Sequence, residues 1–428
     1  MLYHLYQLLK DTLDIPGAGL MTYLSFRSLM AALTGLVAAL IFGGKIIRLL
    51  QKKQIGEEIR DLGLEGQLAK KGTPTMGGII IILSTLVGVL LWEDLTNIYT
   101  ILLCVTLLLL GALGFVDDYV KVFRHNKEGI SEKTKLVGQI ALGLIIGLTV
   151  CYSPKILVRE KVSDAQKTEY RINAATGEVA ERSVPVKEDI VKSTKTTIPF
   201  VKNNEFDYRW LTPLKGKWGW WSKWAIYLIM IVLVITACSN SVNLTDGMDG
   251  LAAGTSAITG LVLMVFAYLS GNAIHTGYLN LMFIPGAGEV AVFMAAMVGA
   301  LVGFLWYNSY PAQVFMGDTG SLAIGGVIGV CAILIRKELL LPLLCGVFFV
   351  EALSVIIQRT HFRRTKAKYG QGRRVFRMAP LHHHFQKEGV AAIIQKPAKA
   401  DPEAKIVTRF WIVQIILAVL AVALLKVR

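Results

Sequence analysis

The sequence carries little charge for its length. Of its 428 residues only 18% are Asp, Glu, Lys or Arg, whereas 54% are hydrophobic. Soluble domains contain about a quarter charged residues, so this composition excludes a soluble globular protein and a disordered one. The apolar residues are gathered in long blocks, which indicates a polytopic membrane protein.

Cysteine is also scarce, and its spacing matches no disulfide or metal pattern. The five cysteines, an odd number, all lie in or at the ends of apolar blocks, which is typical of packing residues. The first residues lack the basic start and the small-residue cleavage site of a signal peptide, so we expect none. A Walker motif is also missing, which makes an ATPase a weak interpretation.

Long apolar blocks predict ten membrane-spanning helices, since a span needs about 20 mostly apolar residues. The blocks are 27–47, 75–92, 98–116, 136–153, 224–240, 250–270, 289–308, 319–335, 339–358 and 409–426. The predicted fold class is an all-α polytopic membrane protein, with residues 1–428 as a single transmembrane domain. Residues 1–20 have leucines at helical spacing and are expected to form an interfacial helix.

The distribution of basic residues predicts the orientation. The net charge is +15, and the Lys and Arg residues are concentrated in loops on one side, such as 48–74, 117–135 and 359–408. The short loops on the other side have only Arg336 and Lys337. The positive-inside rule makes the first side cytoplasmic, and an even number of spans places both termini outside. The basic residues form no domain of their own, so the expected partners are membrane lipids and anionic substrates, with no nucleic acid.

One long loop, 154–223, lies on the outer side. It is polar, and stretches such as Thr-Glu-Tyr-Arg-Ile and Thr-Gly-Glu-Val predict short strands around a turn near Gly177. We expect a small β-rich extracytoplasmic insertion in preference to a plain linker. Four tryptophans between 218 and 224 are typical of an aromatic belt at the membrane interface.

Aspartates gather in the loops on the predicted cytoplasmic side. In chain order they are Asp117 and Asp118 after the third span, Asp246 and Asp249 between the fifth and sixth, and Asp318 between the seventh and eighth. Adjacent carboxylates repel each other unless a cation or a proton lies between them. Oxygen ligands of this kind suit a hard cation such as Mg²⁺, which binds one or two carboxylates together with waters and a substrate phosphate.

Helix capping is the alternative interpretation of each aspartate. An Asp at the start of a span satisfies free backbone N–H groups, and for Asp249 or Asp318 alone this is as well supported as chemistry. Asp117 and Asp118 end a helix, where the dipole disfavours negative charge. Three such sets on one side favour a metal or phosphate site. Asp246 and Asp249 share a face if the turn between them is helical.

Other motifs lie on the same side. Residues 70–78 open the second span with a glycine-rich turn, which suits either phosphate binding or an ordinary loop before a helix. The three histidines at 382–384 are too close together to ligate one metal, but they can bind phosphate or act as acid or base. The arginines between 359 and 377 suit lipid head groups and substrate phosphate equally. Glu351, inside the ninth span, is either functional or a pairing group between helices.

Together these motifs resemble those of the phospho-N-acetylmuramoyl-pentapeptide transferases. The shared segments are Lys-x-Gly-Thr-Pro-Thr-Met-Gly-Gly, Asp-Asp-Tyr, Asn-Leu-Thr-Asp-Gly-x-Asp-Gly-Leu-Ala, Met-Gly-Asp-Thr-Gly-Ser and Pro-Leu-His-His-His-Phe. The wider superfamily of polyprenyl-phosphate N-acetylhexosamine-1-phosphate transferases shares the aspartate motifs, whereas the Thr-Pro-Thr-Met-Gly-Gly and triple-His forms point to this branch. The chain departs from the family at Gln386, where a Glu is usual, and in the longer insertion 154–223.

The resemblance implies a Mg²⁺-dependent reaction in which UDP-MurNAc-pentapeptide and undecaprenyl phosphate give lipid I and UMP, the first membrane step of peptidoglycan synthesis. It places the protein in the bacterial inner membrane with the active site on the cytoplasmic face, and homodimers are common in the family. Two alternatives stay open. One is a GlcNAc-1-phosphate transferase acting on the same lipid, and the other is a transporter for an anionic substrate.

The resemblance also assigns residues to roles. Asp318 would hold Mg²⁺. The residues expected to be catalytic are Asp117, Asp118, Asp246 and His383, and those expected to bind substrate are Lys70, Thr75, Asn240, Asn243, Asp249, His382 and His384. Asp117 would deprotonate the lipid phosphate or, in a two-step scheme, attack the diphosphate itself. We favour the first role, because the lipid phosphate is already a competent nucleophile.

Overall fold

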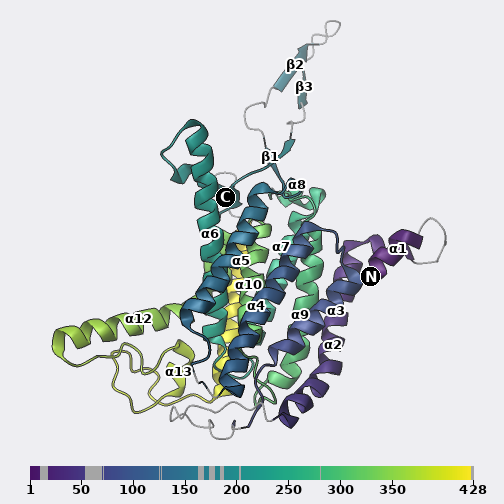
Figure 1. Cartoon of the computed structure of the whole chain (residues 1–428). Helices are drawn as coiled ribbons and strands as arrows, with labels where there is room; N and C mark the ends of the chain where they lie inside the picture. Colours follow the sequence, from purple (N-terminus) through teal and green to yellow (C-terminus); the bar gives the residue numbers. More distant parts are fainter. Residues whose placement is uncertain are drawn as a thin grey trace.

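The chain folds mainly into helices that run side by side (Figure 1). The structure, a computed structural model, describes residues 1–9, 18–53, 70, 72–124, 126, 128–161, 168–172, 179–183, 188–201, 204–279 and 281–425. The long helices are α2 (Leu24–Lys52), α3 (Gly78–Trp92), α4 (Ile98–Phe123), α5 (Glu132–Tyr152), α6 (Gly216–Thr245), α7 (Leu251–Ser270), α9 (Gly288–Asn308), α10 (Gly317–Leu334), α12 (Gly346–Tyr369) and α14 (Glu403–Leu424). The short ones are α1 (Leu2–Leu9), α8 (Ala273–Leu279), α11 (Leu341–Leu344) and α13 (Leu381–Gln386).

Among the described residues, eight helices are long and apolar enough to cross a membrane, or nine if one bent pair counts as a single span. That pair is Glu338–Leu344 with Gly346–Tyr369, which meet at 78°. The predicted span 339–358 is therefore a broken helix, and α12 leaves the bundle sideways in Figure 1. Helix α3 has 15 residues and falls below that length, so ten spans stay a prediction.

Helix α10 lies at the centre of the bundle. All its residues from Thr319 to Leu334 are buried, and it packs against α4, α6 and α3. Glycines allow the closest approaches: a Cβ on Gly78 would lie 2.1 Å from the backbone nitrogen of Gly320, and one on Gly114 would lie 2.1 Å from the carbonyl oxygen of Asp318. These contacts bring the end of α4 and the start of α3 against the start of α10.

The loop before α3 pairs with the loop before α10. The backbone of Phe315 donates to Pro74 O at 2.8 Å, Gly77 donates to Phe315 O at 2.8 Å, and Gly78 donates to Met316 O at 2.8 Å. Because these groups bond across the two loops, α3 begins at Gly78 and not at the predicted residue 75. We call residues 73–77 and 314–316 the paired loops.

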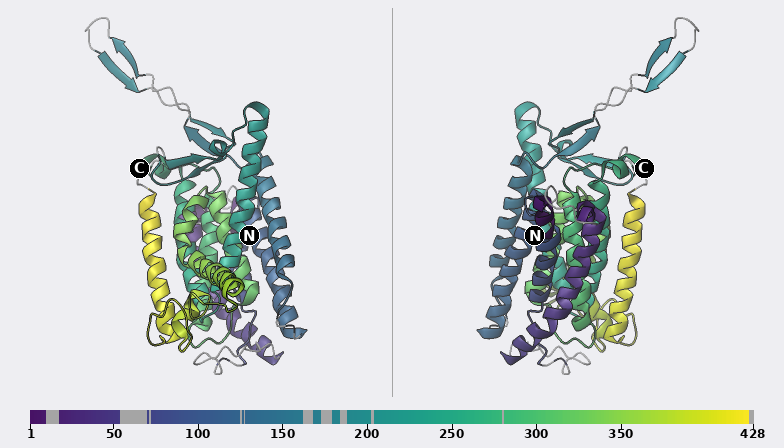
Figure 2. Two further views of the ribbon diagram at one scale, coloured as in Figure 1. Left: turned by 90° about the vertical axis from the view of Figure 1, so that its left-hand side faces the viewer. Right: turned by 90° about the vertical axis from the view of Figure 1, so that its right-hand side faces the viewer.

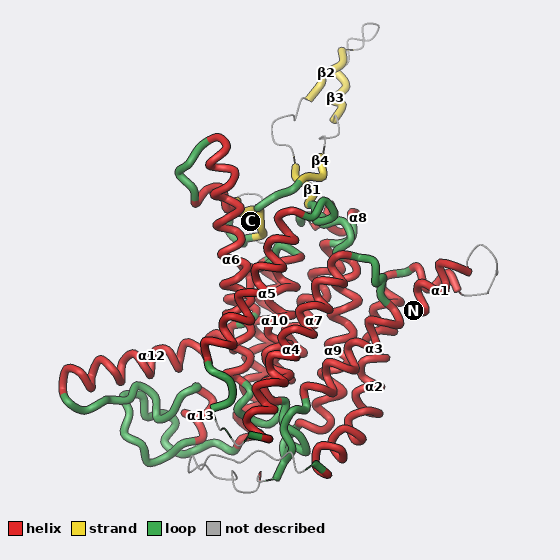
Figure 3. The backbone as a smooth tube through the Cα atoms, viewed as in Figure 1, coloured by secondary structure: helices red, strands yellow, loops and turns green. Residues whose placement is uncertain are grey.

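In the described part of the segment between α5 and α6 there are six short strands. They form three antiparallel pairs: β1 (Val158–Lys161) with β4 (Glu188–Val191), β2 (Thr168–Ile172) with β3 (Val179–Ser183), and β5 (Lys195–Thr197) with β6 (Glu205–Asp207). The β2–β3 pair projects away from the helices, and the strands occupy the end of the molecule opposite α13 (Figures 2 and 3). The base of the insertion is anchored, since Lys337 Nζ lies 2.6 Å from Thr197 Oγ1 and Tyr208 donates to Glu338 at 3.2 Å.

Candidate active site

Three predicted site residues meet where α4 packs against α10. Asp117 and Asp118 lie in the last turns of α4, and Asp318 lies in the first turn of α10. One oxygen from each carboxylate lies within 4.8 Å of the others. Asp117 is fully buried and Asp118 nearly so. Asp318 is distant in the sequence from Asp117 and Asp118, and the close packing of α4 on α10 brings the three together.

Asp118 holds the start of α10. Its carboxylate accepts hydrogen bonds from the backbone of Asp318 at 3.1 Å and of Thr319 at 2.9 Å, and from Thr319 Oγ1 at 2.6 Å. Asp118 thus caps α10 from a neighbouring helix. Gly317 fits beside it because its φ is +72° and a Cβ there would lie 2.6 Å from Asp118 Oδ2 and 3.0 Å from Thr75 Oγ1.

Two lysines connect the other two carboxylates. Lys121 Nζ lies 2.7 Å from Asp117 Oδ2 and 3.2 Å from Asp318 Oδ1. Lys135 Nζ lies 2.9 Å from Asp117 Oδ2 and 2.5 Å from Asp318 Oδ2. We call these five side chains the Asp–Lys cluster: Asp117, Asp118, Asp318, Lys121 and Lys135. Neither lysine was among the predicted site residues, although Lys121 lies four residues after Asp117 and so shares its helical face.

The carboxylates of the Asp–Lys cluster could hold a divalent cation. Two ammonium groups already lie between Asp117 and Asp318, so the site stabilises positive charge at this point. Carboxylate oxygens are the ligands that Mg²⁺ prefers. Asp318 and Asp117 could hold such an ion, while Asp118 is occupied by the N–H groups of α10.

The predicted residues of α6 divide into two groups. Asn243 Nδ2 donates to Asp318 Oδ1 and to Ser321 Oγ, both at 2.9 Å, so it joins the Asp–Lys cluster. Asn240 Nδ2 instead donates to Gln139 Oε1 and to a backbone carbonyl of its own helix, both at 2.9 Å. Asp246 caps the end of α6 and is not one of the three grouped carboxylates.

Lys70, Asp249 and Glu403 form a second ion network, separate from the Asp–Lys cluster. Lys70 Nζ lies 2.6 Å from Asp249 Oδ1 and 2.6 Å from Glu403 Oε1, and Glu403 also accepts from the backbone of Asp249 at 2.8 Å. The turn that carries Asp246 and Asp249 is not helical, so the condition for a shared helical face is not met. Sequence reasoning missed Glu403, because one acidic residue at the start of the last span resembles an ordinary helix cap.

The three histidines of α13 have different surroundings. His382 is fully buried, and its Nδ1 lies 3.2 Å from Glu351 Oε2. His383 Nδ1 lies 3.3 Å from Gln386 Oε1, and burial, with the charge of His382 second, lowers the pKa of His383 to about 3. His384 accepts from the backbone of Arg377 at 3.1 Å, and its Nε2 lies 2.8 Å from Lys396 O. His384 therefore fixes the loop around it with both ring nitrogens.

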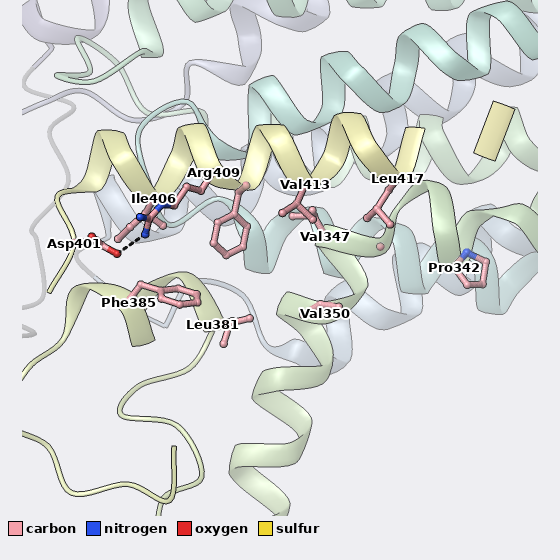
Figure 4. Close-up of a pocket in the computed structure, with 12 residues that line it drawn as sticks. Pro342, Val347, Val350, Leu381, Phe385, Asp401, Ile406, Arg409, Val413 and Leu417 are labelled. Atoms are coloured by element: carbon pink, nitrogen blue, oxygen red, sulfur yellow. Dashed lines mark hydrogen bonds and ion pairs between the residues drawn. The ribbon is translucent and has the colours of Figure 1, made fainter. Parts of the chain in front are cut away.

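The opposite face of α13 lines an apolar groove (Figure 4). The groove has a volume of about 530 Å³ and lies between α11, α12, α13 and α14. Leu381 and Phe385 of α13 face it, together with Val347, Val350, Ile406, Phe410, Val413 and Leu417. At one end Arg409 pairs with Asp401 at 2.7 Å. Helix α13 is thus amphipathic, with its histidines and its apolar side chains on different sides.

Comparisons with known proteins agree with this geometry. The family model described as glycosyl transferase family 4 matches residues 193–336, and phospho-N-acetylmuramoyl-pentapeptide-transferase signature 1 matches residues 70–82. Proteins named phospho-N-acetylmuramoyl-pentapeptide-transferase are 54% identical in Parabacteroides distasonis, 53% in Porphyromonas gingivalis and 50% in Flavobacterium johnsoniae. Each alignment covers 100% of both chains. The chain belongs to the phospho-N-acetylmuramoyl-pentapeptide transferase family.

Proposed function

We propose that this chain transfers phospho-MurNAc-pentapeptide from UDP-MurNAc-pentapeptide to undecaprenyl phosphate, which gives lipid I and UMP. The observation that carries the proposal is the Asp–Lys cluster, in a chain that matches proteins named for this activity along its whole length. A soluble sugar nucleotide and a membrane lipid phosphate must meet at such a site. Its mixed charge suits phosphates and the cation that accompanies them.

The step is a phosphoryl transfer. An oxygen of the lipid phosphate attacks the β-phosphorus of the sugar nucleotide, the bond from that phosphorus to the bridging oxygen of UMP breaks, and UMP leaves with the bonding electrons. Asp117 takes the proton of the lipid phosphate where that phosphate is protonated. Lys121 and Lys135, which lie within 3.2 Å of the carboxylates, offset the charge that gathers on the phosphate oxygens.

Mg²⁺ is the proposed cofactor, held by Asp318 with help from Asp117. When bound, it would shield the diphosphate and stabilise the leaving UMP. Asp118 keeps Asp318 in place through the N–H groups of α10, and Asn243 orients the same carboxylate.

The second network supplies the proposed nucleotide site. Lys70 and Asp249 face each other beside the ring of Phe315, so they could contact uridine or the diphosphate, with Thr75 and Asp246 nearby in the same loops. His382 and His383 would contact the phosphate and sugar side. Asn240 stays a predicted binding residue, although its amide is engaged with Gln139.

The proposed topology has ten spans, with both termini and the insertion 154–223 outside the cytoplasm of the inner membrane. The basic loop 359–408, with its histidines, lies on the cytoplasmic side. This placement is supported by the separation between the strands and α13, which lie at opposite ends of the bundle (Figure 2). A homodimer, common in the family, is proposed for the assembly.

The test is UMP release by the purified protein in detergent with UDP-MurNAc-pentapeptide and undecaprenyl phosphate, with and without Mg²⁺, beside Asp318→Asn. We expect Mg²⁺-dependent release that the variant lacks. Release only from UDP-GlcNAc would move the assignment to the GlcNAc-1-phosphate transferases. If folded protein releases no UMP from either donor, the transporter hypothesis would be reopened.

A further inference from the structure

Helix α12 leaves the bundle with one side uncovered. It begins after the 78° bend and runs sideways at the end of the molecule that carries α13 (Figure 1). In its first half the uncovered side is apolar, since Leu353, Ile356 and Ile357 are between 47% and 59% exposed. Residues spaced by three and four positions share one side of a helix. In a chain that spans a membrane, such an apolar side faces lipid hydrocarbon.

The same side becomes basic in the second half of the helix. Arg363 and Arg364 lie two turns after Ile356 and Ile357, so they continue the apolar side. The five exposed cations of this half, called here the α12 cations, are Arg359, Arg363, Arg364, Lys366 and Lys368. A side that changes from apolar to basic along its length is typical of a helix that leaves hydrocarbon and enters the head-group layer.

The α12 cations have no acidic partner. The sequence has no Asp or Glu from residue 352 to residue 387, and none of the five cations forms an ion pair within the part of the chain that the structure describes. The exposed cations at the start of α14 are paired, by contrast: Lys405 lies 2.6 Å and Arg409 2.7 Å from the carboxylate of Asp401. Like charges repel one another, so the α12 cations are stabilised by an anion from outside the chain.

The chain that follows α12 packs on another side of the helix. Gln358 Oε1 accepts from the backbone of Val375 and of Phe376, both at 3.0 Å. Thr365 Oγ1 accepts from the backbone of Arg373 at 2.8 Å. These bonds hold the loop against the side of Gln358 and Thr365, and the α12 cations face outward.

We propose that the outer side of α12 is a binding surface for anionic phospholipid. Leu353, Ile356 and Ile357 would contact the acyl chains, and the α12 cations would contact the phosphate of the head group. Substrate phosphate fits this surface less well, because α12 carries the cations away from the bundle (Figure 1), whereas the grouped aspartates lie where α4 packs on α10. The inference does not depend on the proposed reaction.

The test is cross-linking of the full chain, purified in a neutral detergent, to a photoactivatable phosphatidylglycerol, with the labelled residues identified by mass spectrometry. We expect labelling to concentrate on residues 353–368. Unlabelled phosphatidylglycerol should displace the probe, whereas phosphatidylcholine should not. Because each cation near a lipid surface raises affinity for anionic lipid about five-fold, Arg363→Gln/Arg364→Gln should weaken binding of the probe about 25-fold.

Two further double variants are the controls. Lys396→Gln/Lys399→Gln removes two exposed lysines from the loop before α14, so it matches the loss of charge and should leave the affinity for the probe unchanged. Arg363→Lys/Arg364→Lys keeps both charges and should bind the probe as the wild type does. Thermal unfolding of each variant shows that it is folded.

Three results would overturn the inference. If phosphatidylcholine displaces the probe as well as phosphatidylglycerol does, the surface binds acyl chains alone. If UDP-MurNAc-pentapeptide displaces the probe, the cations belong to the site of the sugar nucleotide. If Arg363→Gln/Arg364→Gln is labelled as strongly as the wild type, the cations do not hold the head group. The first two results are obtained with the wild type, and none of the three uses UMP release, so failure of the proposed reaction is measured separately.

Discussion

Asp117 and Asp118 are adjacent in the sequence, but their side chains have different roles. Asp117 lies between two lysines, whereas Asp118 caps α10. We expect Asp118→Asn to lower the free energy of unfolding by about 1 kcal/mol, because an amide replaces the charge at the helix start, and to lower activity as Asp318 shifts. Asp117→Asn should cost about 100-fold in kcat and should also lower the free energy of unfolding, because it removes the charge that pairs with both lysines. For both variants, UMP release in detergent measures the activity and thermal unfolding measures the stability.

Gln386, two residues after the three histidines, offers a second test at the residue scale. As the pH falls below about 6.5, unfolded His383 takes up a proton, whereas the folded residue, with its pKa at about 3, does not. Stability is therefore lost between these values. Gln386→Glu adds a negative charge beside Nδ1 and should raise the pKa of His383, so it should stabilise the protein more at pH 5 than at pH 8.

Melting temperatures at the two pH values measure this difference. Gln371→Glu, which adds the same charge at an exposed position, is the matched control. An equal shift at both pH values in Gln386→Glu would show that the new carboxylate does not reach His383.

Residue patterns revealed the site only in part. The three grouped aspartates follow from their motifs, and Lys121 could have been found from its spacing. Lys135 and Glu403 could not, because each reaches its partners through helices that are distant in the sequence: Lys135 from α5 meets Asp318 of α10, and Glu403 from α14 meets Lys70. Such pairs depend on the packing of the bundle, which a local pattern does not contain.

At the scale of elements, glycines determine how closely helices approach. Gly78→Ala would place a Cβ 2.1 Å from the backbone nitrogen of Gly320, which cannot move aside as a flexible side chain would. We expect a loss of about 1–3 kcal/mol in unfolding free energy and a strong loss of activity, because α10 carries Asp318. Gly44→Ala is the control, since its nearest neighbour would be Tyr307 Oη at 3.5 Å. Equal effects of both substitutions would contradict this account.

The ends of a helix were predicted correctly where a change in hydropathy marks them. Helices α7 and α9 begin and end within one residue of the predicted spans. The break before α12 was not predicted, because the span was drawn from hydropathy alone; Pro342 and Gly346, which flank the break, were the local signal for it. The start of α6 at Gly216 was also missed, since its tryptophans were taken as the end of a loop while the structure has them within the helix.

At the scale of the whole molecule, helix α5 separates the insertion from the Asp–Lys cluster, since Lys135 lies at its start and β1 follows its end. The strands and α13 lie at opposite ends of the bundle (Figure 1). Lys161 and Glu188 are paired residues of β1 and β4, so a short Gly-Ser link can replace residues 163–186. We expect this variant to keep the kcat and KM of the wild type, measured by UMP release. A KM for undecaprenyl phosphate that rises several-fold would show that the insertion takes part in handling the lipid.

The paired loops have a consequence for where the reaction takes place. Helix α3 has 15 residues, about 22 Å at 1.5 Å per residue, whereas the hydrocarbon of a bilayer is about 30 Å thick. The paired loops extend α3 with irregular backbone, which membrane depth tolerates when its polar groups bond within the protein. Helix α4 also continues past Asp118 to Phe123, about 8 Å further along its axis.

The carboxylates are therefore recessed below the rim of the bundle. The sugar nucleotide must therefore enter the bundle below the level of the surrounding loops. The lipid phosphate must reach the same depth, which depends on the thickness of the surrounding bilayer. Turnover in vesicles should then vary with acyl-chain length, with an optimum where the hydrocarbon thickness matches the bundle. The thickness of the membrane becomes, in effect, a parameter of the enzyme.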